Sequence, residues 1–163
     1  MMPRMKLHHD LSYDAAPAAV FAMLTDPEFW DKVAVATGAI SSTATVEDDG
    51  GATKVVVDQE QAVVGVPGFA KKFVGDSTRA ITTQVWSGTT AAFSVDTPGK
   101  PTSINGTATI TEQGGGSVLT YDLEVKASVP LIGGKLEKLV VELTTEGFGK
   151  ERAVGAAWLA GDR

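Results

Sequence analysis

The first patterned segment of the chain, residues 5–13, alternates between apolar and polar side chains. Its mainly apolar face carries Met5, Leu7, His9, Leu11 and Tyr13. Successive side chains of a strand point to opposite faces, so this alternation predicts a strand that is buried on one side. His8 and His9 then lie on opposite faces, and the pair cannot bind one metal ion.

Two short helices are predicted directly after this strand, over residues 16–25 and 26–38. Pro17 suits the first turn of the first helix, because a helix leaves the N–H groups of that turn unpaired in any case. Asp26 is placed to cap the second helix, and Gly38 is placed to end it.

Between residues 40 and 129, turn sequences rich in glycine, aspartate and proline separate runs of valine, threonine and isoleucine. This spacing predicts about six further antiparallel strands. The dipeptide Asn105–Gly106 is a hairpin signal, but a turn there would leave a very short strand before it. We therefore predict one continuous strand from Thr102 to Thr111, and a last strand over residues 118–129.

A long helix is predicted from about Lys135 to about Ala160. At 100° per residue, its apolar positions collect on one stripe, which we expect to face the sheet. The stripe consists of Leu136, Leu139, Val140, Leu143, Gly147, Val154 and Trp158. Phe148 is expected to point away from the sheet. With Val141 and Leu159 it forms a weaker stripe, which would meet the short helices or, in a homodimer, a second copy of the chain.

The order of these elements predicts an α+β fold in which a curved antiparallel sheet of about seven strands wraps around the long C-terminal helix. Three segments carry a resemblance to known proteins: LTDPEFW (24–30), TPGKPTSINGT (97–107) and GGGSVLTYDLEVKASVPLIGGKLEKLV (114–140). On these segments the chain resembles the START-like (SRPBCC) helix-grip superfamily, and more narrowly an uncharacterised bacterial family of unknown function within it. The resemblance covers nearly the whole chain, which we expect to form a single domain over residues 1–163. It implies an apolar cavity that binds lipids, polyketides or other hydrophobic molecules and only sometimes acts on them.

Composition and charge narrow the classes of function. The chain has 163 residues, no cysteine and a formal net charge of -6. Without cysteine there is no disulfide, thiolate nucleophile or cysteine-bound zinc, and we expect neither a metal nor another cofactor. Nucleic-acid binding is not expected, because it needs a basic surface. No apolar run approaches the ~20 residues of a membrane span, and the N-terminus lacks the features of a signal peptide, so a cytoplasmic location is predicted.

The sequence LIGGKLEK, residues 131–138, invites comparison with a phosphate-binding loop. It lacks the spacing G-x-x-x-x-G-K-[ST], and Leu136 stands where serine or threonine would bind magnesium. We therefore interpret Gly133 and Gly134 as the joint between the last strand and the long helix.

Several side chains are candidates for lining a ligand pocket. Gln59 and Gln61 share a face with the apolar positions of their strand, where two amides can orient a carbonyl or hydroxyl group. The alternative is that they satisfy backbone groups or lie in an edge strand. Tyr121 faces inward and its hydroxyl needs a partner. Gly147 would enlarge the cavity or allow the helix to bend, and close packing of the helix on the sheet is the alternative. The full set of predicted ligand-binding residues is His9, Gln59, Gln61, Trp86, Phe93, Tyr121, Leu143 and Gly147; for the aromatic residues, core packing is the alternative.

Three functions are compatible with these patterns. The leading hypothesis is a non-enzymatic protein that binds a small hydrophobic molecule, lipid or polyketide-like, between sheet and helix, because no acid, base and nucleophile converge in the sequence. The first alternative is a cyclase- or dehydratase-like enzyme, in which His9 and Tyr121 act as acid and base on a bound carbonyl compound. The second is a protein-interaction module without a ligand, which a filled core near Gly147 would favour.

Overall fold

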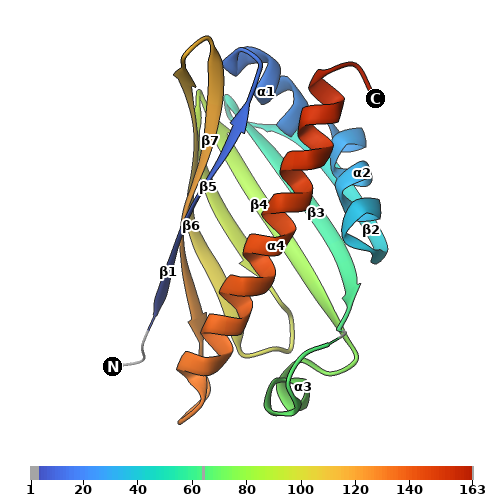
Figure 1. The fold of residues 1–163 in the computed structure, drawn as a ribbon, viewed down its shortest axis with the longest axis vertical. Helices are drawn as coiled ribbons and strands as arrows, with labels where there is room; N and C mark the ends of the chain where they lie inside the picture. Colours follow the sequence, from blue (N-terminus) through green and yellow to red (C-terminus); the bar gives the residue numbers. More distant parts are fainter. Residues whose placement is uncertain (1–3, 64, 163) are drawn as a thin grey trace.

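A computed structural model of the chain describes residues 4–63 and 65–162 (Figure 1). Within these residues seven strands form one antiparallel sheet, in the order β1-β7-β6-β5-β4-β3-β2. The strands are β1 (Met5–Tyr13), β2 (Ala39–Asp49), β3 (Ala52–Ala62), β4 (Ser77–Ser87), β5 (Thr90–Asp96), β6 (Thr102–Gln113) and β7 (Gly116–Ala127). Neighbours in sequence are neighbours in the sheet, except that β1 pairs with β7. The predicted sheet of about seven strands is confirmed.

The described part of the chain contains four helices: α1 (Pro17–Leu24), α2 (Pro27–Thr37), α3 (Gly68–Val74) and α4 (Gly133–Leu159). Figure 1 shows α4 running diagonally across one face of the sheet, with α1 and α2 at one end and α3 at the other. Asp26 caps α2 by accepting a hydrogen bond from the N–H of Glu28 at 3.0 Å. The two short helices and the long helix are confirmed. The sequence does not predict α3, because seven residues are too few to show a helical period.

The strand β6 continues through Gly106, as predicted, and the glycine has a steric reason. A Cβ atom at Gly106 would lie 2.0 Å from the carbonyl oxygen of Asp122 on β7. Only glycine allows the two backbones to approach so closely. The Asn-Gly pair therefore serves strand pairing here and not a hairpin turn.

The core has two parts. The larger part lies between the sheet, α1, α2 and the second half of α4, and its largest buried side chains include Leu11, Leu24, Phe29, Trp86, Leu119 and Tyr121. The smaller part lies where α3 packs against the end of β7 and the start of α4, and it consists of Ala70, Ala127, Val129 and Leu136.

The orientation of α4 corrects the predicted one. Phe148, expected to point away, is buried against the sheet, whereas Leu143, expected to face it, is 48% exposed. The buried face of the helix also carries Glu137 and Glu151. Because these glutamates are polar, counting apolar positions displaced the centre of the buried face toward Leu143. The predicted second stripe is also reassigned, since Phe148 packs within the main core of this chain.

Candidate functional site

A hydrogen-bonded polar group is buried where α4 crosses the middle of the sheet. Tyr121 of β7 donates its hydroxyl hydrogen to Oε2 of Glu151 on α4, at 2.8 Å. Nearby on β4, the indole N–H of Trp86 donates to Oε1 of Gln84 at 3.0 Å. All four side chains are buried. We call Gln84, Trp86, Tyr121 and Glu151 the buried polar cluster.

Burial shifts the proton equilibria of this cluster. Removal from water raises the pKa of Glu151 to about 7, while the hydrogen bond from Tyr121 opposes that rise. Burial also raises the pKa of Tyr121 well above its usual value, and the negative charge of Glu151 adds to the effect. The Gln84 side chain acts on Tyr121 in the opposite direction. Glu151 therefore changes between its protonated and ionised forms near neutral pH.

Aromatic rings surround the tyrosine of this cluster. Phe148 of α4 stacks on Tyr121 with ring centroids 4.2 Å apart and planes 2° from parallel. Phe93 of β5 meets the Tyr121 ring edge-on at 5.3 Å. His9, which is paired with Tyr121 across β1 and β7, stacks on Phe148 at 5.6 Å. These rings fill the space between α4 and this part of the sheet and exclude water from the Tyr121–Glu151 hydrogen bond.

Tyr13, at the end of β1, brings a second hydroxyl close to Glu151. Its ring packs against α4 at Gly155, where a Cβ atom would lie 2.7 Å from the ring. Its hydroxyl oxygen is buried and has no hydrogen-bond partner among the described residues. Burial and then the charge of Glu151 raise the pKa of Tyr13. Buried hydroxyl groups are normally paired, so this one is available to a bound molecule.

The concave face of the sheet is covered unevenly. On β3, Val55 and Val57 are fully buried, whereas Gln59 and Gln61, which point to the same side, are only half-buried. On β4, Gln84 is buried and Thr82, two residues earlier, is half-buried. The half-buried residues lie at the ends of β3 and β4 that adjoin α3. The concave face is therefore closed at the α1–α2 end and partly open toward α3.

Gly147 lies on the flank of α4 that turns toward this partly open region. It is about 20° from Trp158 around the helix axis, and Trp158 contacts Phe29 of α2 with ring centroids 5.8 Å apart. This flank of α4 therefore turns toward α2 and the β2–β4 half of the sheet. Gly147 is half-buried, and a Cβ atom built on it would meet no other atom within 4 Å. A larger side chain at this position would enter open space.

Comparison with known families identifies the chain. The family described as "Protein of unknown function (DUF2505)" matches residues 8–159. The chain belongs to this family. Among curated proteins, none matches it. Membership in DUF2505 accounts for the sequence resemblance, but it assigns no ligand and no reaction.

Solved structures share the fold of this DUF2505 protein. TTHA0849 from Thermus thermophilus is 15% identical, with a TM-score of 0.67, and the match covers 96% of this chain and 97% of that one. The di-domain ARO/CYC StfQ of the steffimycin biosynthetic pathway is 11% identical, with a TM-score of 0.69, over 96% of this chain and 51% of that one. Ara h 8.0201 is 10% identical, with a TM-score of 0.61, over 94% and 98%. At these identities the comparisons establish the helix-grip fold alone.

The structure brings some of the predicted site residues of this DUF2505 protein together and separates others. Tyr121, Trp86 and Phe93 gather in and around the buried polar cluster, and His9 lies on the same concave face. Gln61 is drawn to the end of α2, where its amide donates to the hydroxyl of Thr37 at 3.0 Å. Gln59, Leu143 and Gly147 lie outside the buried cluster, and their part in ligand binding stays a prediction.

Sequence reasoning missed Tyr13, Gln84 and Glu151 as site residues. A usable signal existed for Glu151, because it lies seven residues before Trp158 and therefore about 20° from it around the helix axis. A glutamate at that angle falls inside the apolar stripe. No comparable signal marked the unpaired hydroxyl of Tyr13, since the missing partner is a property of the packed structure.

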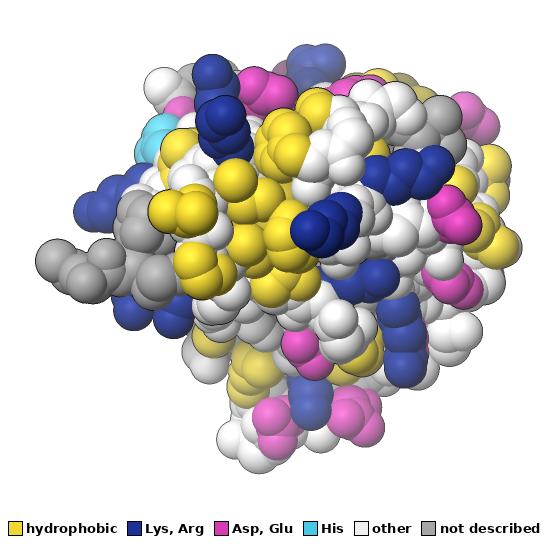
Figure 2. Space-filling model, turned by 90° about the horizontal axis from the view of Figure 1, so that it is seen from below, with side chains coloured by type: hydrophobic (Ala, Val, Ile, Leu, Met, Phe, Trp, Pro, Cys, Tyr) yellow, Lys and Arg dark blue, Asp and Glu magenta, His cyan; other side chains and the backbone are white. Residues whose placement is uncertain are grey.

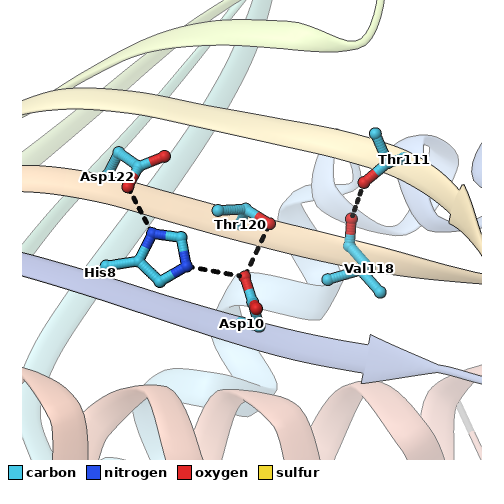
Figure 3. A network of polar contacts seen from close by, with 6 residues as sticks. All are labelled: His8, Asp10, Thr111, Val118, Thr120 and Asp122. Carbon is cyan, nitrogen blue, oxygen red and sulfur yellow. Dashed lines mark hydrogen bonds and ion pairs between the residues drawn. The ribbon is translucent and has the colours of Figure 1, made fainter.

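The outer face of the sheet carries a second polar group in this DUF2505 protein (Figure 3). His8 lies between Asp122, 2.5 Å away, and Asp10, 3.5 Å away, and Asp10 also accepts a hydrogen bond from Thr120. The hydrogen bond with Asp122 raises the pKa of His8. A depression of about 430 Å³ adjoins it. These side chains are more than half exposed, so water competes for every contact.

In residues 4–63 and 65–162, no three side chains of the metal-binding types lie close enough together to hold a metal ion.

Proposed function

We propose that this protein binds a small hydrophobic molecule with one polar group, in the partly open space between Gly147 and the concave face of β3 and β4. The observation that supports this proposal is the gradient of burial along those strands. It runs from half-buried Gln59 and Thr82 to the buried polar cluster. Ligand sites in proteins combine an apolar lining with a few converging polar groups. Here Val55 and Val57 supply apolar surface at the buried end, and Gln59 and Thr82 supply polar groups at the open end.

The polar end of the ligand would lie at the inner end of this space. Glu151, with a pKa of about 7, accepts a hydrogen bond when ionised and donates one when protonated. The unpaired hydroxyl of Tyr13 can do either. A hydroxyl or carbonyl group is therefore the polar group that fits best. The open space beside Gly147 argues against the alternative of a filled core without a ligand.

Two glycine variants of α4 test the proposal. Gly147→Leu fills the open space, whereas Gly149→Leu places the same side chain on the exposed side of the helix, where it also meets no atom within 4 Å. Each change removes a helical glycine and should stabilise the fold by up to about 1 kcal/mol. The probe is the fluorescent naphthalene 1-anilinonaphthalene-8-sulfonate, titrated against folded protein.

We expect Gly147→Leu to weaken binding of the probe at least tenfold and Gly149→Leu to leave it unchanged. Thermal unfolding must show that both variants are folded. Equal affinities in the two variants would place the probe elsewhere and contradict the proposed site. Native mass spectrometry of the protein purified from its own host would then identify the class of natural ligand.

A second function, acid–base catalysis on a hydrophobic carbonyl compound, is favoured by one observation. A buried carboxyl group with a pKa of about 7 is well suited to exchange protons at neutral pH. Glu151 and Tyr121 would form the acid–base pair, and His9, stacked on Phe148, would line the site.

The catalytic alternative is tested by turnover of a panel of β-hydroxyketones, followed by the absorbance of the dehydrated product. Glu151→Gln and Tyr121→Phe should then abolish turnover while the probe still binds. Absence of turnover in the unmodified protein would reject catalysis on this class and leave the binding proposal intact.

A further inference from the structure

The end of the molecule that carries α3 presents apolar side chains to water. Around the smaller core, Val66, Phe73, Ile132 and Leu139 are partly buried. Beyond them, Phe69 on α3 is 37% exposed and Leu131, in the loop between β7 and α4, is 104% exposed. Figure 2 looks at the molecule from this end and shows apolar side chains gathered into one patch. We call Phe69 and Leu131, with these four neighbours, the apolar tip.

Leu131 is the central residue of a γ-turn, in which the N–H of Ile132 donates to the carbonyl oxygen of Pro130 at 2.8 Å. Its φ is 70°, and it is the single non-glycine residue with positive φ in the described ranges. Leucine is disfavoured there, while glycine adopts this conformation freely. Because the side chain is fully exposed, it contributes no burial to offset the strain. Strained residues of this kind concentrate at functional sites.

Lysines surround the apolar tip. Lys71 and Lys72 lie in the last turn of α3, and Lys135 and Lys138 lie in the first turns of α4. All four are exposed. Asp76 lies 3.5 Å from Lys71 and offsets one of these charges. Figure 2 shows basic side chains around the apolar patch, although the whole chain has a net charge of -6.

We propose that the apolar tip and its lysines dock on the surface of a bilayer that contains anionic lipids. Leu131 and Phe69 would enter the boundary between headgroups and acyl chains, and the lysines would contact the acidic headgroups. Apolar insertion and basic charge together give the two signals that stable attachment to a membrane surface needs. No helix in the described ranges is long and apolar enough to cross a membrane, so the attachment would be peripheral.

Charge favours a bilayer over a second copy of the chain. A two-fold contact between two apolar tips would bring the lysines of one copy against those of the other. A fully projecting leucine is also suited to insertion into a fluid surface, where no preformed pocket is needed. The proposal does not depend on the proposed ligand, because docking uses other residues and is measured without a ligand.

The test is co-sedimentation of the full chain with vesicles of phosphatidylcholine alone or with about one third phosphatidylglycerol, at low and high salt. Leu131→Asn removes the apolar side chain, and asparagine tolerates positive φ, so the fold is kept. Lys138→Glu reverses a charge beside the tip. Its control is Lys150→Glu, an exposed lysine on the same helix roughly 18 Å away at 1.5 Å per residue. The apolar control is Val35→Asn, which is 81% exposed on α2.

We expect binding to the anionic vesicles only, weakened by salt. Leu131→Asn should reduce the partition coefficient about tenfold, and Lys138→Glu about fivefold or more. We expect three variants to bind the anionic vesicles as strongly as the unmodified protein does: Lys150→Glu, Val35→Asn and Gly147→Leu.

Three outcomes would overturn the proposal: no binding to anionic vesicles, equal binding to neutral vesicles, or equal losses in the tip and control variants. Sedimentation velocity identifies the main competing occupant. A dimer that Leu131→Asn dissociates would assign the tip to a second copy of the chain.

Discussion

The ionisation of Glu151 gives a sharp prediction about how stability depends on pH. Its pKa rises from 4.5 to about 7 because the folded protein buries it. Below pH 4.5 the carboxyl group is protonated in both the folded and the unfolded chain, so its ionisation does not change the free energy of unfolding. As the pH rises from 4.5 to 7, the unfolded chain ionises first, so the free energy of unfolding falls. Above pH 7 the full cost is present.

The size of this effect follows from the shift. A rise from 4.5 to about 7 corresponds to about 3 kcal/mol. In Glu151→Gln the amide oxygen can still accept the hydrogen bond from Tyr121, but the group no longer ionises. Any cost of the buried NH2 group is the same at every pH. We therefore expect the stability of the variant, relative to the unmodified protein, to rise by up to about 3 kcal/mol between pH 4.5 and 8.

The assay is urea unfolding followed by tryptophan fluorescence at half-unit steps of pH. Thermal unfolding should show the same trend, with a relative gain in Tm of roughly 6–12 °C for a chain of this size. Glu146→Gln, on the exposed side of the same helix, is the control and should change the trend by less than about 0.5 kcal/mol. A constant difference between Glu151→Gln and the unmodified protein across this range would refute the reasoning.

Three further substitutions probe the packing around the site. Tyr13→Phe removes an unpaired buried hydroxyl and should stabilise the fold by about 1 kcal/mol in urea unfolding. If the substitution instead destabilises the fold by more than about 1 kcal/mol, the hydroxyl has a partner. Gly155→Ala places a Cβ atom against the ring of Tyr13 and should cost about 1–3 kcal/mol, whereas Gly149→Ala, its exposed counterpart, should stabilise by up to about 1 kcal/mol. Equal effects of the two would show that the ring moves aside. In the unmodified protein the buried N–H of Ala127 donates to Oε2 of Glu137 at 2.9 Å. Glu137→Ala removes this acceptor and should lower the free energy of unfolding by about 1–3 kcal/mol. Faster hydrogen exchange at the Ala127 amide would confirm the cause.

The strands could be predicted because their physical signal is local. Alternation alone placed Val55 and Val57 on the buried face and His8 and His9 on opposite faces, as the structure has them. The pairing of β1 with β7 brings His9 beside Tyr121. The two residues are far apart in the chain, so no local pattern in the sequence predicts that they meet.

The long helix shows where such reasoning fails. Its apolar stripe is correct at Leu136 and Trp158 but misplaced between them, because Glu151 is polar and yet buried. A buried glutamate is stabilised by partners such as Tyr121, which the sequence places 30 positions away. Phe148 was misassigned for the same reason, since its stacking partner comes from a distant strand. Buried polar groups and their aromatic surroundings depend on tertiary contacts, so the candidate residues Tyr13, Gln84 and Glu151 were the hardest to predict.

The two proposals meet at one end of the molecule. Along β3, burial decreases from Val57 to Gln59, in the direction of α3. The partly open side of the concave face therefore points toward the end that carries Leu131. If that end docks on a bilayer, a hydrophobic molecule leaving the lipid would pass Gln59 before it reached the buried polar cluster, and it would cross little water on the way. The strain at Leu131 and the unpaired hydroxyl of Tyr13 would then serve successive steps of one process, uptake at the tip and recognition inside. Gly147→Leu and Leu131→Asn separate these steps, because the first should block recognition without affecting docking and the second should do the reverse.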